Sequence, residues 1–472
     1  MSQYNKTFIT KITMIATLGG LLFGYDTAVI SGTVGALKDF FILPKGLEEF
    51  DANSLLGFVV SSALIGSIIG GLSGGLIARK LGRKKGMLIA ATLFLISAIG
   101  SSIPEMGFAP IGDGSHIHIT QFIIYRIIGG IGVGLASMLA PMYIAEMAPA
   151  SKRGGLVSWN QFAIIFGMLI VYFVNYSIAT QGDDAWLNTI GWRWMFASEA
   201  IPAITFLFLL NFVPESPRWL ILNNKEEEGL HILETINGKE EAKLVYDDIV
   251  GSMEHHASAS VFSFGYFIIV VGMLLSVFQQ FVGINVVLYY APEIFKSMGM
   301  GTDAALFQTI IVGAINLTFT IVAIKTVDKY GRKPLQIVGA VGMAVSMFAL
   351  GMAFFLDNVG TVALIFMLTY VASFALSWGP VTWVLLSEIF PNKIRGAALA
   401  IAVATQWIAN YLVSWTFPMM NDSSYLTENF NHGFAYWVYG AMGVLAAIFV
   451  YKFVPETKGK TLEEIEAVWE KK

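Results

Sequence analysis

The nonapeptide EMAPASKRG (residues 146–154) returns 242 residues later as EIFPNKIRG (residues 388–396). Both copies keep the pattern Glu-x-x-Pro-x-x-x-Arg-Gly, and each copy follows a long apolar run. Two shorter motifs repeat in the same order, PES (214–216) as PET (455–457) and GRK (82–84) as GRK (331–333), displaced by 241 and 249 residues. Motifs that recur in one order at nearly one displacement indicate an internal duplication.

The composition is that of a chain that crosses a membrane many times. Of its 472 residues, 56% are hydrophobic and only 13% are charged, with a mean hydropathy of +0.66, whereas a soluble protein carries roughly a quarter charged residues. Twelve apolar runs are long enough to span a bilayer, centred near residues 20, 65, 93, 130, 166, 203, 275, 315, 343, 372, 405 and 441. We therefore expect an all-α membrane protein with two pseudo-symmetric bundles of six transmembrane helices.

The longest polar segment lies between the two groups of six spans. We expect an N-terminal bundle over residues 1–220, a linker with short helices over 221–259, a C-terminal bundle over 260–455 and a tail over 456–472. Residues 226–235 have the pattern of a short amphipathic helix. His255 and His256 could bind a metal, but paired histidines in a polar loop are usually solvated, so we predict no metal site and no cofactor.

The positions of lysine and arginine predict that both termini are cytoplasmic. Basic residues gather after the second, fourth, eighth and tenth spans, in the linker and in the tail, and they favour the cytoplasmic side. Segments 101–120, 177–191, 354–360 and 417–431 contain none. Three lysines depart from this pattern: Lys38, Lys45 and Lys296.

The stretch FQQFVGINVVLYY (278–290) places three amides and two tyrosines inside an apolar run. Uncharged amides both donate and accept hydrogen bonds, which suits a neutral, hydroxyl-rich ligand. Gly283 in its middle allows the backbone to break or bend. The alternative is that the amides only hold neighbouring helices together.

Two spans each carry a single strong charge, Asp26 in the first and Arg126 in the fourth. A charge at that depth costs a few kcal/mol or more unless it is paired or neutralised, so we expect the two side chains to face each other. Burial and a nearby guanidinium act on a carboxyl pKa in opposite directions. A change in their separation would let Asp26 take up a proton on one side and release it on the other. The alternative is a static ion pair. Glu199 in the sixth span is a further candidate for the proton path.

Charged residues also repeat at the predicted cytoplasmic ends of both halves. Partly desolvated Arg–carboxylate pairs have fixed geometry and are stronger than surface pairs. Between the halves, such pairs would hold the cytoplasmic side closed and would break as the halves rock. The alternative is that these residues are solvated topology signals. The candidates are Arg83, Glu146, Arg153 and Glu215 in the first half, and Asp328, Arg332, Glu388, Arg395 and Glu456 in the second.

Taken together, these motifs resemble those of the sugar porter family of the major facilitator superfamily. The resemblance is carried by GR (82–83), PESPR (214–218), the 278–290 stretch, DKYGRK (328–333) and PETKG (455–459), and it covers essentially the whole chain. It implies duplicated six-helix halves with the substrate held between them at mid-membrane. In one place the chain departs from the family pattern Gly-x-x-x-Asp-Arg-x-Gly-Arg: the first-half copy has Arg79 where the acid should stand, whereas the second half keeps Asp328. The first-half link must therefore be made differently or be weaker.

The resemblance also assigns a sugar site and supports the coupling pair. Gln161, Gln279, Gln280, Asn285, Trp383 and Gln406 match sugar-contacting positions, Phe23, Tyr289 and Trp407 match the aromatic lining, and Asp26 and Arg126 match the family's coupling pair. Asn316 and Asn410 are further polar candidates; Asn410 lies one turn after Gln406 on one helix face. Tryptophan offers a flat apolar face to a sugar ring and an N–H donor at its edge. Met168 lies two turns after Gln161 on the same face, where we expect a glutamine in a proton-coupled pentose transporter, so hexoses stay open.

The resemblance implies a proton-coupled monosaccharide importer that works by alternating access in the cell (inner) membrane, as a monomer, for a D-xylose-like pentose or glucose. A facilitative uniporter is the alternative, but a uniporter needs no titrating carboxyl such as Asp26.

A membrane sugar sensor would need a long cytoplasmic extension. An enzyme is not expected, because the chain has no cysteine and no His-x-x-x-His pair, and because His116 and His118 lie in a predicted external loop. The expected partners are the sugar, the proton and the lipid bilayer, with no nucleic acid.

Overall fold

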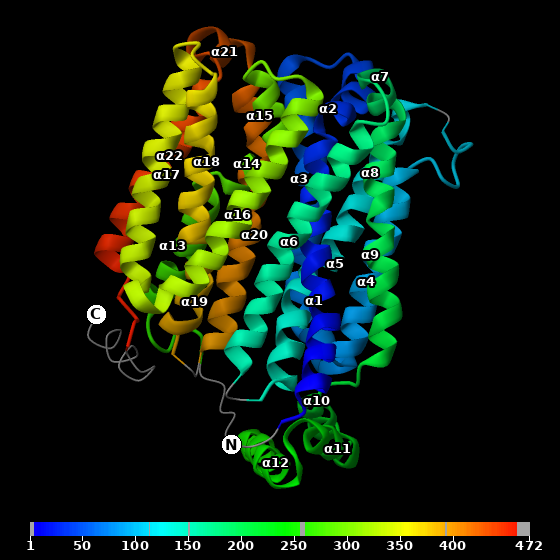
Figure 1. Ribbon diagram of the computed structural model, residues 1–472, viewed down its shortest axis with the longest axis vertical. Coiled ribbons are helices and arrows are strands. Elements are labelled where there is room, and N and C mark those ends of the chain that lie inside the picture. The colour runs from blue at the N-terminus through cyan, green and yellow to red at the C-terminus, as the bar shows by residue number, and fades with distance from the viewer. Residues whose placement is uncertain (1–3, 113, 150–151, 255–259, 392–393, 460–472) are drawn as a thin grey trace.

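The computed structural model is a bundle of long helices that run nearly parallel to one another (Figure 1). It describes residues 4–112, 114–149, 152–254, 260–391 and 394–459. The expectations for His255, His256 and the chain beyond residue 459 lie outside this part. Within it, twelve helical segments are long and apolar enough to cross a membrane, and each of the twelve predicted span centres falls within one of them. The predicted fold is therefore confirmed.

Six of these segments come from each half of the sequence. The first six are α1 (Lys6–Val29), α3 (Glu49–Leu81), α4 (Arg83–Ser102), α5 (Ile119–Met147), α6 (Arg153–Ala179) and the run of α7 (Asp184–Trp186), α8 (Trp192–Ser198) and α9 (Ala200–Leu209). The second six are α13 (Tyr266–Phe281) with α14 (Ile284–Tyr289), α16 (Thr302–Tyr330), α17 (Arg332–Phe355), α18 (Thr361–Leu376) with α19 (Trp378–Ile389), α20 (Arg395–Asn421) and α22 (Gly433–Phe453). The exact division of the chain into domains remains a prediction.

Short helices mark the two ends of the bundle. At one end, which we call the linker end, lie α10 (Pro217–Leu222), α11 (Glu226–Asn237) and α12 (Lys239–Glu254) (Figure 1). At the opposite end lie α2 (Val34–Leu37), α15 (Ala291–Ser297) and α21 (Ser424–Phe430) (Figure 1). The predicted amphipathic helix corresponds to α11. It packs with α10 and α12 around a small core of Ile221, Leu233, Ala242 and Ile249.

Glycine lets helices within a half approach closely. A Cβ on Gly24 of α1 would lie 1.8 Å from the carbonyl oxygen of Ile164 in α6, and a Cβ on Gly167 would lie 2.2 Å from that of Leu21. Without a hydrophobic driving force inside lipid, such backbone contact is a main source of helix association. The high glycine content is thus used to hold α1 against α6.

Two spans of the second half are broken. Gly283, with φ at +93°, separates α13 from α14, so the break predicted in the amide-rich stretch is confirmed. The second break falls at Ser377, between α18 and α19, just before Gly379-Pro380. Proline is tolerated in the first turn of α19 because the N–H that it lacks would have no helical partner there.

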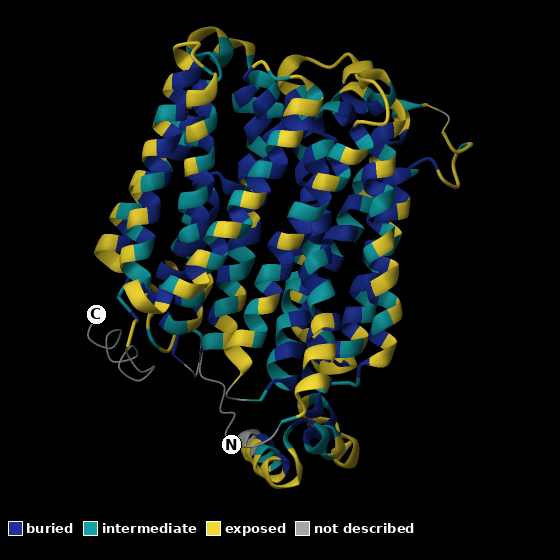
Figure 2. Cartoon of the chain, in the orientation of Figure 1, coloured by how far each residue is buried: buried dark blue, intermediate teal, exposed yellow. Residues whose placement is uncertain are grey.

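The flanks of the bundle are apolar. Exposed positions occur along the whole length of the helices (Figure 2), and many are occupied by large apolar side chains such as Ile201, Phe208 and Val338. A soluble protein rarely exposes apolar surface so extensively. These flanks are suited to contact with lipid.

Candidate functional site

Asp26 of α1 and Arg126 of α5 form a buried ion pair in the first half. Arg126 Nη1 lies 2.8 Å from Asp26 Oδ1, and Nη2 donates to the Asp26 carbonyl oxygen at 3.1 Å. Both residues are almost completely buried, and the guanidinium also lies 5.3 Å from the centre of the Phe196 ring. The prediction that these two charges face each other is confirmed.

Glu199, at the junction of α8 and α9, belongs to the same cluster. It is fully buried, and its carboxylate oxygens accept no hydrogen bond from the N–H and O–H donors of the described residues. It lies within electrostatic range of both Asp26 and Arg126. Two buried carboxylates beside one guanidinium would leave an uncompensated negative charge, which is costly in an apolar interior. The cluster therefore favours holding one proton.

The predicted amides of the second half form one connected network. Gln279 of α13 donates to the carbonyl oxygen of Trp378 at 2.9 Å, and its own side-chain oxygen accepts from Gln406 of α20 and, at 3.4 Å, from Gln280. Asn285 of α14 donates to Gln280. The amides thus bond both to the backbone and to one another, so they hold helices together and also place exchangeable donors and acceptors in one cluster. The Oε1 atom of Gln406 is buried and has no partner among the described residues.

Tyr289 of α14 bonds to a further amide, Asn410 of α20, and lies near the acid cluster. Asn410 donates to the Tyr289 hydroxyl at 3.4 Å and accepts from Ser414 at 3.1 Å. Tyr289 also lies within electrostatic range of Asp26 and Arg126. The amide network and the buried acids are therefore neighbours across the boundary between the halves.

The other predicted sugar residues lie outside the hydrogen-bonded amide network. The rings of Phe23 in α1 and Trp407 in α20 lie 5.6 Å apart and bring the two halves together. Trp383 of α19 is partly exposed, Asn316 of α16 is buried and Gln161 of α6 is half-buried. Among the described residues, neither Gln161 nor Asn316 forms a hydrogen bond to the amide network. Their part in a sugar site remains a prediction.

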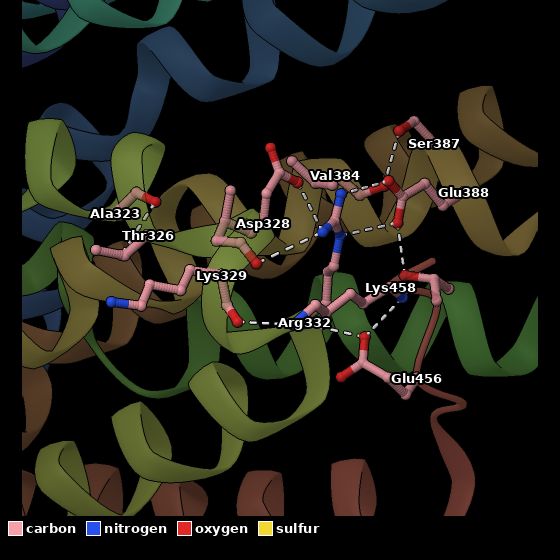
Figure 3. Close-up of polar contacts among 12 residues, drawn as sticks. Ala323, Thr326, Asp328, Lys329, Arg332, Val384, Ser387, Glu388, Glu456 and Lys458 are labelled. Carbon is pink, nitrogen blue, oxygen red and sulfur yellow. Dashed lines mark hydrogen bonds and ion pairs between the residues drawn. The ribbon is translucent and has the colours of Figure 1, made fainter. Parts of the chain in front are cut away.

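At the linker end, Arg332 binds two acids of its own half (Figure 3). Its guanidinium makes two hydrogen bonds to Glu388, at 2.9 and 3.1 Å, and lies 2.8 Å from Asp328 Oδ1. Glu456 accepts hydrogen bonds from the backbone N–H groups of Arg332 and Lys333, at the start of α17. A carboxylate is favourable there because these N–H groups lack helical partners.

The first half repeats this arrangement. Arg83 Nη2 lies 2.6 Å from Glu146, and Glu215 accepts from the backbone N–H groups of Arg83 and Lys84. Where the second half has Asp328, the first half has Arg79. Arg83 Nη1 donates to the Ala78 carbonyl oxygen at 2.8 Å, and Arg332 Nη1 likewise donates to that of Val327 at 3.5 Å. Among the described residues, the first half therefore has no counterpart of the Arg332–Asp328 ion pair, in line with the expectation that its link is made differently or is weaker.

Sequence reasoning missed the hydroxyl partners of this motif. Ser216 donates to Glu146, and Thr457 donates to Glu388. Both hydroxyls stand in the repeated PES and PET tripeptides, so the repeat itself carried the signal. These hydrogen bonds hold the carboxylates of Glu146 and Glu388 in place beside Arg83 and Arg332.

In the described part of the chain, the nine predicted gate residues form hydrogen bonds and ion pairs only within their own halves. Arg153 donates to the Ala145 carbonyl oxygen and Arg395 to that of Phe390; the other seven form the contacts given above. In contrast, Trp415 Nε1 donates to the Ser54 carbonyl oxygen, and the Tyr172 hydroxyl to that of Leu288, between the halves and away from the linker end. The side-chain hydrogen bonds between the halves therefore lie toward the end opposite the linker. A gate at the linker end remains a prediction.

Comparison with known sequences identifies related proteins. The sequence model of the family described as "Sugar (and other) transporter" matches residues 12–469. The D-xylose-proton symporter of Escherichia coli K12 is 63% identical, over 99% of this chain and 97% of its own. The glucose facilitated diffusion protein of Zymomonas mobilis is 41% identical, over 99% of both chains, and the arabinose-proton symporter of Bacillus subtilis is 40% identical, over 99% and 96%.

Solved structures agree with this similarity. The inward open conformation of the xylose transporter XylE from E. coli matches with a TM-score of 0.90 and 61% identity, over 98% of this chain and all of that chain. XylE bound to 6-bromo-6-deoxy-D-glucose matches with a TM-score of 0.84 and 63% identity, over 99% of this chain and all of that one. Of these two scores, the higher belongs to the inward open form.

Proposed function

The chain belongs to the sugar transporter family, and on that premise we propose how its two polar clusters carry out the proton-coupled import of a monosaccharide. The observation that carries the proposal is the position of Tyr289, which accepts a hydrogen bond from Asn410, one turn after Gln406, and lies within electrostatic range of Asp26 and Arg126. A side chain that lies near both sites lets the occupancy of one alter the other. Such coupling is reciprocal, so the proton favours sugar binding by as much as the sugar favours proton binding.

The acid cluster is the proposed proton carrier. With Asp26 ionised, its ion pair with Arg126 ties α1 to α5. A proton on Asp26 removes the charge that Arg126 compensates and frees α1 to move relative to α5. Glu199 lies near Asp26, and its carboxylate accepts no hydrogen bond from a described donor. It is the proposed second proton-binding group.

The amide network is the proposed sugar site. Its members are joined by amide–amide hydrogen bonds, and sugar hydroxyls would replace these by amide–hydroxyl bonds at little cost. The partnerless Oε1 of Gln406 can accept from a sugar hydroxyl. Phe23 and Trp407 supply apolar faces for the C–H side of the ring.

The orientation in the membrane follows from where the charges lie. Because the linker, the tail and the segments after the second, fourth, eighth and tenth spans together carry most of the lysines and arginines, we assign the linker end and both termini to the cytoplasm. The structure then represents an inward-open state of a chain that works as a monomer within the lipid bilayer. Rocking of one half against the other would expose the same site to the outside.

The substrate class is drawn from the relatives and from one residue. Relatives named for D-xylose, arabinose and glucose suggest a monosaccharide, and the 63% identical one suggests a D-xylose-like pentose first. Met168 is buried on α6, two turns after Gln161. A methionine thioether is only a weak hydrogen-bond acceptor, so this position does not enforce pentose selectivity, and glucose remains a candidate.

Uptake into proteoliposomes tests symport against its main alternative. One relative is named for facilitated diffusion of glucose, so a uniporter is the second candidate. With an inside-alkaline pH gradient, we expect labelled D-xylose to accumulate above the external concentration, and the accumulation to disappear when a protonophore is added. Uptake that stops at equilibrium in both conditions would identify a uniporter.

A further inference from the structure

Lys38, Lys45 and Lys296 lie at the end opposite the linker, where the charge pattern predicts few basic residues. The structure gives two of them acidic partners. Lys38 Nζ lies 2.8 Å from Asp422 Oδ2, and Lys296 Nζ lies 3.0 Å from Glu293 Oε1. Lys45 is exposed and forms no ion pair with a described residue. Of the two pairs, only Lys38–Asp422 joins one half to the other.

Further contacts between the halves surround this pair. Asn53 of α3 donates to the carbonyl oxygen of Asp422 at 3.2 Å. Glu49, at the start of α3, accepts hydrogen bonds from both the backbone N–H and the hydroxyl of Ser424 at the start of α21. Asn421 donates to the second carboxylate oxygen of Asp422 at 2.7 Å and so orients the carboxylate toward Lys38. The turn between α20 and α21 is thus fastened to α3 and to the segment after α2.

The exposure of the pair makes it reversible. The Lys38 and Asp422 side chains are 35% and 28% exposed, and both line a cavity of about 520 Å³ that also borders Glu293, Lys296 and His432. Separation of the halves would therefore hydrate two groups that already meet water. A half-exposed ion pair stabilises a contact only modestly, which is what a contact that must open in every transport cycle requires.

We propose that Lys38 and Asp422 form an extracellular latch that holds the two halves together in the inward-open state and opens in the outward-open state. The proposal rests on the proposed alternating-access function. The latch adjusts the ratio of the two states without touching the sugar or the proton. Since a site facing the cytoplasm is closed to external sugar, weakening the latch raises the fraction of protein that can bind sugar from outside.

The absence of cysteine from the chain allows a direct test on the whole protein. Spin labels at Ala185→Cys on α7 and Asn358→Cys between α17 and α18, both exposed, report the separation of the halves at the outer end by pulsed electron spin resonance. The variants are Lys38→Met, Asp422→Asn and the charge exchange Lys38→Glu with Asp422→Lys. Lys45→Met, which removes an outer lysine without an ion-pair partner among the described residues, is the matched control.

Each single latch variant is expected to shift the ratio of long to short distances about two- to fivefold toward the long ones, the range that a half-exposed ion pair supports. The charge exchange is expected to restore the original ratio, and Lys45→Met to leave it unchanged. The latch is overturned if the single variants match Lys45→Met, or if the exchange fails to reverse their shift. The measurement needs neither sugar nor a pH gradient, so this outcome would leave the proposed function untouched.

Discussion

At the scale of single residues, the chemistry of this protein depends on ionisable side chains that would be costly to bury at membrane depth without a partner. Asp26 and Arg126 are stable at depth because each compensates the other, and Glu199 adds a carboxyl that one guanidinium cannot also neutralise. The nearby Tyr289 hydroxyl accepts a hydrogen bond from the amide of Asn410 and lies within electrostatic range of Asp26 and Arg126. Both sites are therefore assembled from a few side chains of unusual type for their depth.

Replacing Asp26 by asparagine is expected to abolish accumulation of sugar while leaving sugar binding intact. The amide keeps the shape of the carboxyl group but cannot bind and release a proton, so the pH gradient can no longer drive uptake. Accumulation in proteoliposomes and a binding titration of the purified variant measure the two properties separately. Retained uphill uptake would contradict the coupling role of Asp26.

Replacing Gln280 by alanine is expected to weaken sugar binding by ~1–3 kcal/mol, because polar groups of the bound sugar and of Asn285 would lose their partner. Binding calorimetry measures the change. Gln181→Ala is a suitable control, since Gln181 is an exposed glutamine that bonds only to the Ser177 carbonyl oxygen in the described structure. Equal affinities for the two variants would remove Gln280 from the site.

At the scale of elements, the halves meet where helices approach backbone to backbone. Gly57 of α3 is such a point, because a Cβ there would lie 2.0 Å from the carbonyl oxygen of Trp415 in α20. The Trp415 indole donates to Ser54 one turn earlier on α3. The closed outer end therefore depends on a glycine that a side chain cannot replace without moving the helices apart.

Gly57→Ala is expected to slow uptake, because the added methyl group keeps α3 from α20 and hinders outer closure. Binding of external sugar is expected to persist, since the outward-open state needs no such approach. Initial uptake rates and equilibrium binding measure the two effects. Gly75→Ala is a control on the same helix, where the nearest atom to an added Cβ is the flexible Met138 methyl carbon at 3.5 Å. Uptake as fast as in this control would contradict the argument.

At the scale of the whole molecule, each half has the same kind of internal Arg–Glu ion pair. The contacts between the halves differ from one end of the molecule to the other. Arg83 and Arg332 bind Glu146 and Glu388 within their own halves, and each half is braced as a rigid unit at the linker end. The proposed outer latch and the Gly57 contact join the halves at the other end. Rigid halves with a contact at one end at a time are the requirement for alternating access.

The duplication, the twelve spans, the charge pattern and the pairing of Asp26 with Arg126 follow from the sequence alone. Each depends on local composition, on repeated motifs, or on the cost of an isolated charge in lipid, and these are the same in every conformation. The adjacency of Glu199 and Tyr289 to Asp26, the Arg83–Glu146 and Arg332–Glu388 pairs and the Lys38–Asp422 pair were decided by the tertiary structure. These contacts join segments far apart in sequence, and those between the halves depend on how two rigid bodies are tilted. One sequence supports more than one such tilt, so only the fold in a particular state specifies them.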